Sequence, residues 1–321
     1  MHHLFLGLPV EQLAVAPYTP AVTEGRVFEV PGFPALYALP VIAGFVGADA
    51  VAAALAAGLD AGEETVLLVD VGTNGEVLLR HAGRLYACSA PAGPAFEGGE
   101  ISQGMRAGPG AIEAVRFDGR DLVVTVIPGG PRSAAGGGGS GTEAARGICG
   151  SGLLDAAAAL LEAGLMDETG RLTHAGPAAH RLAEGGRAVA LAPGVQLTQK
   201  DLRSLQLAKG AIRSGIEVLL RVAGIGPARL DKVLLAGAFG NYLRRESAVA
   251  TGLLPPVDPG RIQPIGNAAI AGAKLALLSR SARDRAEALA RGARFVELAT
   301  HPDFEEVFME ALNFPRVRPG A

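Results

Sequence analysis

The first of three glycine-rich segments with phosphate-binding residue types is Asp70-Val-Gly-Thr-Asn-Gly-Glu76, which follows the apolar run Thr65–Val69. A glycine turn after a buried strand exposes backbone N–H groups to phosphate oxygens, and Thr73 and Asn74 add side-chain donors. Asp70 is suited to hold a hydrated Mg²⁺ or to orient an attacking water, as phosphoryl transfer requires. An ordinary Asn-Gly hairpin turn is the alternative, and this segment alone does not separate the two interpretations.

Two further glycine segments are weaker when each is taken alone. Gly147-Ile-Cys-Gly-Ser-Gly152 leads into a predicted helix, whose unpaired N–H groups and dipole favour an anion. A tight loop with Ser151 as the N-cap is the simpler alternative. Gly237-Ala-Phe-Gly-Asn241 follows a short predicted strand, and its two glycines would let a flat ring lie against the backbone. Plain turn chemistry is the favoured interpretation when that segment is taken alone.

A long apolar loop, Ser89–Glu100, is the fourth candidate, because such a loop is more often a binding surface than a connector. We expect a partner-facing surface there, made of Ser89, Pro94, Phe96 and Glu97. The alternative is that Phe96 packs into the local core.

Cysteine and histidine supply little metal chemistry. The two cysteines, Cys88 and Cys149, are too few for an iron–sulfur cluster that needs four thiolates. The six histidines show no metal-ligand spacing.

Alternating helix and strand signals predict an α/β protein. Strands are expected at 65–70, 76–80, 84–87, 122–127, 232–235 and 295–298, and helices at 49–57, 152–163, 198–223 and about 266–278, with another on each side of the last strand. Gly58 follows the first helix at a left-handed cap position, and Thr198 with Asp201 forms a capping pair. Residues 128–146 are low in complexity and predict a flexible insertion.

Small residues on two of these helices predict a close crossing. Ala53 and Ala56 on the first, with Ala269 and Gly272 on the second, would let the helix axes approach below the usual separation of about 8–10 Å. Such smooth faces suit a shear hinge.

Composition excludes several classes of protein. The 321 residues carry a net charge of −3, which argues against a nucleic-acid binder, and 49% hydrophobic content argues against a disordered chain. Neither a membrane span nor a signal peptide is predicted, so a cytoplasmic location is expected.

The order of these elements resembles the second half of the actin-like ATPase (ribonuclease H-like) fold of acetate and sugar kinases, heat-shock proteins and actin. Five sequence motifs are similar to those of the C-terminal domain of RACo-type reductive activators of corrinoid proteins. They are Asp70–Glu76, Ala92–Gly99, Gly147–Leu153, Gln206–Ile212 and Leu235–Tyr242. The resemblance implies a second lobe at 64–321, with a helical subdomain inserted at about 150–205, and a first-lobe remnant with its connecting helix at 1–63. It also implies a truncated chain, without the ferredoxin domain and the first phosphate loop.

In that family ATP drives electron transfer from an iron–sulfur ferredoxin domain to a Co(II) corrinoid in a partner methyl-transfer protein. The resemblance therefore implies ATP and Mg²⁺ as cofactors, a corrinoid protein and a ferredoxin-type donor as partners, and room for a homodimer. Asp70 and Thr73 would be catalytic, with Asp70 holding Mg²⁺ through a bound water. The implied nucleotide-binding residues are Gly72, Thr73, Asn74, Gly75, Gly150, Ser151, Gly152, Lys209, Gly237, Ala238, Gly240 and Asn241. A non-catalytic partner-binding module and a small-molecule kinase of the same superfold are the alternatives.

Overall fold

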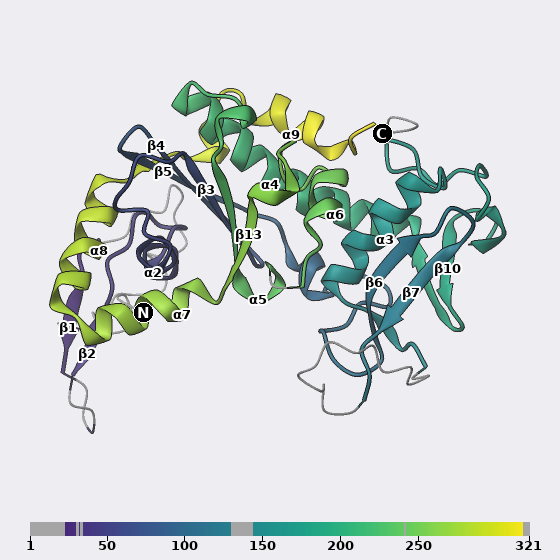
Figure 1. The fold of residues 1–321 in the computed structure, drawn as a ribbon, viewed down its shortest axis with the longest axis horizontal. Coiled ribbons are helices and arrows are strands. Elements are labelled where there is room, and N and C mark those ends of the chain that lie inside the picture. The colour runs from purple at the N-terminus through teal and green to yellow at the C-terminus, as the bar shows by residue number, and fades with distance from the viewer. Residues whose placement is uncertain (1–22, 30–31, 33–34, 130–143, 241, 317–321) are drawn as a thin grey trace.

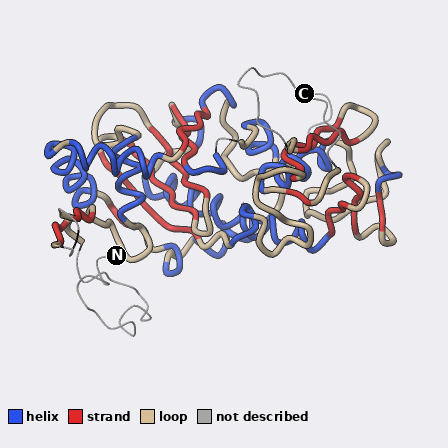
Figure 2. Tube along the Cα trace, turned by 90° about the horizontal axis from the view of Figure 1, so that it is seen from below, coloured by secondary structure: helices blue, strands red, loops and turns tan. Residues whose placement is uncertain are grey.

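A computed structural model describes residues 23–29, 32, 35–129, 144–240 and 242–316. Most of the predicted insertion at 128–146, all of Asn241 and the side chain of Ala238 lie outside the described residues. The strands form two groups in separate halves of an elongated molecule (Figures 1 and 2).

One half is built on a mixed six-stranded sheet. Three strands form an antiparallel meander, and the turn between its second and third strands contains Ala82 and Gly83, both with positive φ. On the other side of the first strand, two strands run parallel to it. The sheet order is β13 (Ile262–Gly266), β12 (Lys232–Ala236), β3 (Val66–Val71), β4 (Gly75–His81), β5 (Arg84–Ala90) and β14 (Arg294–Phe295).

Helices cover both faces of this sheet. Neighbouring residues of each strand point to opposite faces, so each strand contributes side chains to both helix layers. Leu68 faces α2 (Ala48–Ala56), α7 (Ala268–Leu278) and α8 (Arg280–Gly292), and Leu67 faces the other side. There α4 (Gln199–Ala223) packs on the sheet and α9 (Phe304–Leu312) packs on α4 (Figure 1). Both faces are therefore buried, which explains the continuous apolar run that predicted β3.

The two small-residue helices do cross. A Cβ atom at Gly272 of α7 would overlap the backbone carbonyl of Ala52 in α2, so the backbones touch. Ala53, Ala268 and Ala276 are buried around this contact. The predicted meeting of the two helices is confirmed, as is the left-handed Gly58 after α2, with φ of 66°.

The longest helix, α4, begins at the predicted capping pair. The Thr198 hydroxyl accepts from the Asp201 amide at 3.1 Å, and the Asp201 carboxylate accepts from the Thr198 amide at 2.9 Å. The same carboxylate accepts from the amide and the hydroxyl of Ser102, at 2.7 and 2.6 Å. Asp201 therefore caps the helix and also holds a loop from another part of the chain.

The other half contains two small sheets and α3 (Gly150–Glu162), which packs on β6 (Ala111–Phe117). Strand β6 lies between β7 (Leu122–Val126) and β8 (Gly147–Ile148), and the second sheet consists of β9 (Leu182–Ala183), β10 (Ala188–Ala192) and β11 (Val195–Thr198). Residues 150–205, expected to be a helical subdomain, thus combine a helix with strands. Shorter elements are β1 (Arg26–Phe28), β2 (Leu36–Ala38), α5 (Gly237–Gly240), α6 (Arg245–Ala250) and the 3₁₀ helix η2 (Pro94–Glu97).

Candidate functional site

Two of the three glycine turns meet at one edge of the six-stranded sheet. Strands β3 and β12 are parallel neighbours, and Ala236 pairs with Asp70 at their carboxyl ends. Gly237 follows with φ of 85°, and a Cβ atom there would lie 2.6 Å from Asp70 Oδ1. The described residues of the two turns therefore lie against each other. Ligands of open α/β sheets gather at this kind of edge.

The turn after β3 presents its residues to different surroundings. Thr73 and Asn74 are exposed at its tip, Gly72 is half-buried, and Gly75 already begins β4. A Cβ atom at Gly75 would lie 2.6 Å from Ile212 Cγ1, so that glycine packs the turn against α4. Thr73 and Asn74 are the exposed residues of this turn, since the Gly72 amide donates to the Asn74 carbonyl at 3.3 Å.

The Gly147–Gly152 segment joins the site through Phe239 in α5. A Cβ atom at Gly150 would lie 2.9 Å from the ring of Phe239 and would overlap the Phe96 carbonyl oxygen. Cys149, Gly150 and Ser151 line a pocket of about 250 Å³ together with Phe96 and Phe239. The N-terminus of α3 thus shares one small cavity with Phe239 of the turn after β12.

Three residues predicted to bind nucleotide also have packing roles: Ser151 and Gly152 in α3, and Gly240 in α5. The Ser151 hydroxyl donates to the Glu113 carbonyl at 3.0 Å, and Gly152 presses against the carbonyl of Ile112. Both contacts fix α3 on β6. Gly240 folds α5 back on β12, since a Cβ atom there would lie 3.0 Å from the Leu235 carbonyl oxygen.

Lys209, in contrast, is not brought to the turns. Its side chain is fully buried, and Nζ donates to the carbonyl of Ala311 at 2.7 Å and to that of Asn313, at the C-terminal end of α9. The ammonium also lies 4.6 Å from the centroid of the Phe314 ring. Burial, with the nearby charge of Arg213, lowers the pKa of Lys209 to about 7. In this structure the lysine ties the C-terminal segment to α4, so we leave it out of the proposed site.

Three carboxylates interact around the end of β3. Burial raises the pKa of Asp70, and the negative charge of Asp49 in the first turn of α2 adds to the rise. Burial and the charges of Asp49 and Asp70 raise the pKa of Glu76 to about 8. Sequence reasoning assigned no role to Asp49 or Glu76. The available signals were the acid that closes the Asp70–Glu76 motif and the acid that begins the preceding helix.

The loop predicted to face a partner is only partly on the surface. Glu97 is exposed, and Ser89 and Pro94 are half-buried. Phe96 is 4% exposed, and its ring lies 5.0 Å from that of Phe239. The structure therefore places Phe96 in the core, as the alternative interpretation had it, because the turn at Phe239 offers an apolar ring to pack against.

Family models match almost the whole chain. Residues 64–319 match the C-terminal domain of RACo, the ASKHA domain, and residues 1–62 match the RACo middle region. The chain belongs to the RACo family. ASKHA denotes the acetate and sugar kinase, heat-shock protein and actin superfamily, so the predicted actin-like ATPase fold is confirmed.

Similar proteins are reductive activators of corrinoid proteins. The corrinoid activation enzyme RamQ of Eubacterium limosum is 34% identical over 96% of this chain and 54% of its own length. The [Co(II) methylated amine-specific corrinoid protein] reductase of Methanosarcina barkeri is 31% identical over 86% of this chain and 51% of its own length. A solved structure of a reductive activator for corrinoid,iron-sulfur protein superposes with a TM-score of 0.82 at 32% identity, covering 98% of this chain and 51% of that one. This RACo-family chain thus spans about half the length of these relatives.

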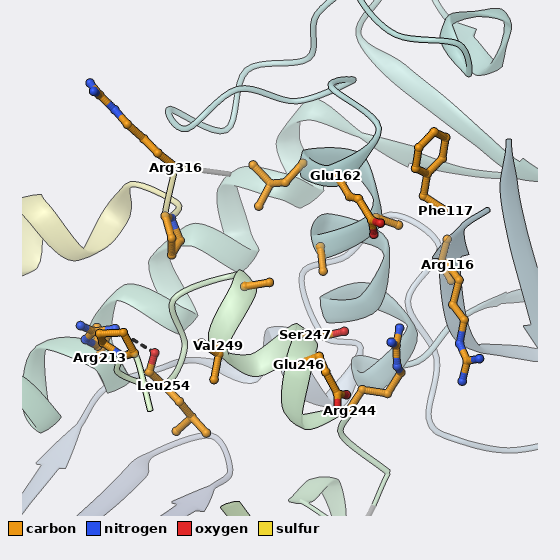
Figure 3. A pocket seen from close by; sticks show the side chains of 17 residues that line it. Arg116, Phe117, Glu162, Arg213, Arg244, Glu246, Ser247, Val249, Leu254 and Arg316 are labelled. Carbon is orange, nitrogen blue, oxygen red and sulfur yellow. Dashed lines mark hydrogen bonds between the residues drawn. The ribbon is translucent and has the colours of Figure 1, made fainter. Parts of the chain in front are cut away.

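A separate cavity of about 730 Å³ lies between β6, α3 and α6 of the RACo-family chain, with Arg213 of α4 and Arg316 also lining it (Figure 3). Arg244 at its edge approaches the buried carboxylate of Asp155 at 3.8 Å. Burial raises the pKa of Asp155, and Ser247 and Arg244 oppose that rise. Of the described residues predicted for a site, none lines this cavity. We therefore assign the candidate site to the two turns, where the family's ATPase-type fold and the predicted motifs coincide.

The described residues also bear on metals and membranes. They include no group of three or more His, Cys, Asp and Glu side chains that could hold a metal ion. Mg²⁺ usually takes one or two carboxylates and completes its shell with water and substrate phosphates, so a single carboxylate at Asp70 fits that ion. No described helix combines the length and the apolar character needed to cross a membrane.

Proposed function

We propose that this chain is the nucleotide-binding part of a reductive activator that restores Co(I) in a corrinoid methyl-transfer protein. ATP would drive electron transfer from an iron–sulfur ferredoxin-type donor, which the two cysteines of this chain cannot supply. The relatives described above support the corrinoid protein as partner. They do not bear on ATP, which rests on the fold and on the turns.

One observation carries the nucleotide assignment: the backbone of Gly237 lies against the carboxylate of Asp70, so that a Cβ atom there would lie 2.6 Å from Asp70 Oδ1. The two turns therefore form a single edge, with the donors of Thr73 and Asn74 on one side and the aromatic wall of Phe239 on the other. Phosphates would bind the donors, and the pocket beside Phe239 would offer apolar walls to the base. Asp70 would hold Mg²⁺ through a bound water.

Calorimetric titration of the chain with ATP and Mg²⁺ tests this assignment. Gly237→Ala places a Cβ atom on the Asp70 carboxylate and keeps a positive φ that alanine adopts at a cost of roughly 1–2 kcal/mol. The added methyl group displaces the carboxylate that is proposed to hold Mg²⁺, so we expect ATP affinity to fall by about tenfold or more, equivalent to about 1.4 kcal/mol. Gly58→Ala is the matched control, because Gly58 has φ of 66° and open space around it.

The outcomes separate the competing functions. ATP binding by the unaltered chain that is lost in Gly237→Ala and kept in Gly58→Ala supports the proposal. Absence of ATP binding, together with retained affinity for a corrinoid protein, would favour the non-catalytic partner-binding module. Phosphorylation of a small molecule in place of corrinoid-protein binding would favour the kinase.

A further inference from the structure

The hydroxyl of Thr73, the exposed donor at the tip of the β3–β4 turn, is already engaged. Its Oγ1 donates to Glu97 Oε1 at 2.6 Å, and the Gly93 amide donates to the Thr73 carbonyl at 2.9 Å. Segments 24 residues apart in the sequence are thereby joined by two hydrogen bonds. One of the two uses the side chain that we propose to bind phosphate.

A carboxylate and a phosphate compete for such a donor. A hydroxyl has a single hydrogen to donate, so Thr73 cannot serve both anions. Hydrogen bonds from a hydroxyl to an ionised oxygen are short and strong, and the 2.6 Å separation at Glu97 is of that kind. A negative charge at this position also repels an incoming phosphate.

The backbone around Glu97 is anchored while its side chain is not. Phe96 is buried against Phe239, and η2 packs on both α3 and α4. Gly98 has φ of 83°, and a Cβ atom there would lie 2.7 Å from the Met105 amide nitrogen. The Glu97 carboxylate itself is exposed, so water can replace the Thr73 hydroxyl as its partner when the contact opens. Replacement of Glu97 by a phosphate at the Thr73 hydroxyl therefore requires movement of the Glu97 side chain alone.

We infer that Glu97 stands in for a nucleotide phosphate on the β3–β4 turn and is released when phosphate takes the Thr73 hydroxyl. The inference rests on the proposed nucleotide function and adds to it a regulatory link. Because Glu97 belongs to the loop predicted to face the corrinoid protein, the nucleotide state decides whether the carboxylate of this loop is bound to Thr73 or released. The exchange involves no covalent step.

A double-mutant cycle on ATP binding tests the exchange. Glu97→Gln keeps the shape of the side chain and removes its charge, so MgATP affinity measured by calorimetry should rise about three- to fivefold. Glu100→Gln removes an exposed charge three residues away in the same loop and should leave affinity unchanged. In a Thr73→Val background the gain from Glu97→Gln should be clearly smaller, because the shared donor is gone and only the repulsion between the charges remains. Unfolding midpoints of Thr73→Val, Glu97→Gln and the double variant measure the contact without nucleotide, and we expect them to be non-additive.

Each result has a defined meaning. Equal affinity changes for Glu97→Gln and Glu100→Gln would reduce the effect to general charge and overturn the inference. ATP binding by the unaltered chain with no gain in Glu97→Gln would overturn it while leaving the nucleotide function intact. Additive unfolding midpoints would show that the Thr73–Glu97 contact is not formed in solution. Absence of ATP binding in every variant would remove both proposals.

Discussion

At the scale of single residues, the end of β3 keeps its negative charge low. Burial and the negative charges of Asp49 and Asp70 raise the pKa of Glu76 to about 8, which favours its protonated form at neutral pH. Burial also raises the pKa of Asp70. A site for phosphate gains from this, since a second full negative charge beside Asp70 would repel the ligand.

Glu76 makes stability depend on pH in a direction that can be derived. Its pKa rises from an ordinary 4.5 to about 8 on folding, so the native state binds more protons than the unfolded state between these values. The free energy of unfolding should therefore fall as pH rises from 4.5 to 8, by at most about 1.4 kcal/mol per pH unit. Glu76→Gln should flatten this slope and be more stable than the unaltered protein at pH 8. Urea unfolding at several pH values measures both effects.

Glu63→Gln, in the exposed loop before β3, is the control for removal of a carboxylate. An unchanged slope in Glu76→Gln would show that other groups produce the pH dependence.

Residue types indicated chemistry at the turns but did not indicate burial. Thr73 and Asn74 are small polar residues in a glycine turn and lie exposed as predicted. A lysine in a helix, such as Lys209, is expected at the surface. Its burial depends on hydrogen bonds to carbonyl groups about 100 positions further along the chain. Phe96 likewise depends on Phe239, a partner that local sequence does not reveal.

At the scale of elements, the close contact of α2 with α7 depends on a glycine, which has no side chain. Gly272 meets the backbone of Ala52, and its neighbours at the crossing are alanines. Backbone atoms cannot move aside as a flexible side chain can, so an added methyl group must separate the helices.

Gly272→Ala should therefore destabilise the protein by about 1–3 kcal/mol, despite the better helix propensity of alanine. Gly292→Ala at the end of α8 makes the same chemical change with nothing within 4 Å of the added atom and should be neutral or slightly stabilising. Thermal unfolding of the two variants gives the comparison. Equal melting temperatures would mean that the helices separate freely.

Elements were predictable where one periodic signal dominated. The meander β3–β4–β5 and the capped helix α4 match their predictions because apolar runs, turn residues and the Thr198–Asp201 pair agree. Strand β13 was missed because it contains Pro264, which reads as a break. The structure explains it: β13 is the edge strand, and an edge tolerates a residue without an N–H group.

At the scale of the whole molecule, the two halves join around η2. Its packing on α3 and α4 connects the small sheets with the large one, and Phe96 is its buried anchor. The sequence predicted the motifs on each side of this junction but not their convergence, because the convergence depends on contacts between distant segments.

Phe96→Ala should accordingly cost about 3–5 kcal/mol in unfolding free energy, the range for removing a buried aromatic ring. Any loss of partner binding should follow the loss of stability. Leu207→Ala, which truncates a side chain 48% exposed on α4, is the control and should have little effect. Urea midpoints at a constant m-value provide the measurement. A stable Phe96→Ala protein that no longer binds a corrinoid protein would return Phe96 to the partner surface.

The hydrogen bonds at Asp201 have a kinetic consequence. The amides of Ser102 and Thr198 both donate to its carboxylate, and its own amide donates to the Thr198 hydroxyl. Each of these N–H groups is held within this one cluster, although Ser102 and Asp201 lie 99 residues apart. In hydrogen exchange the three amides would therefore share one opening event, so the first turn of α4 and the loop at Ser102 form a single cooperative unit.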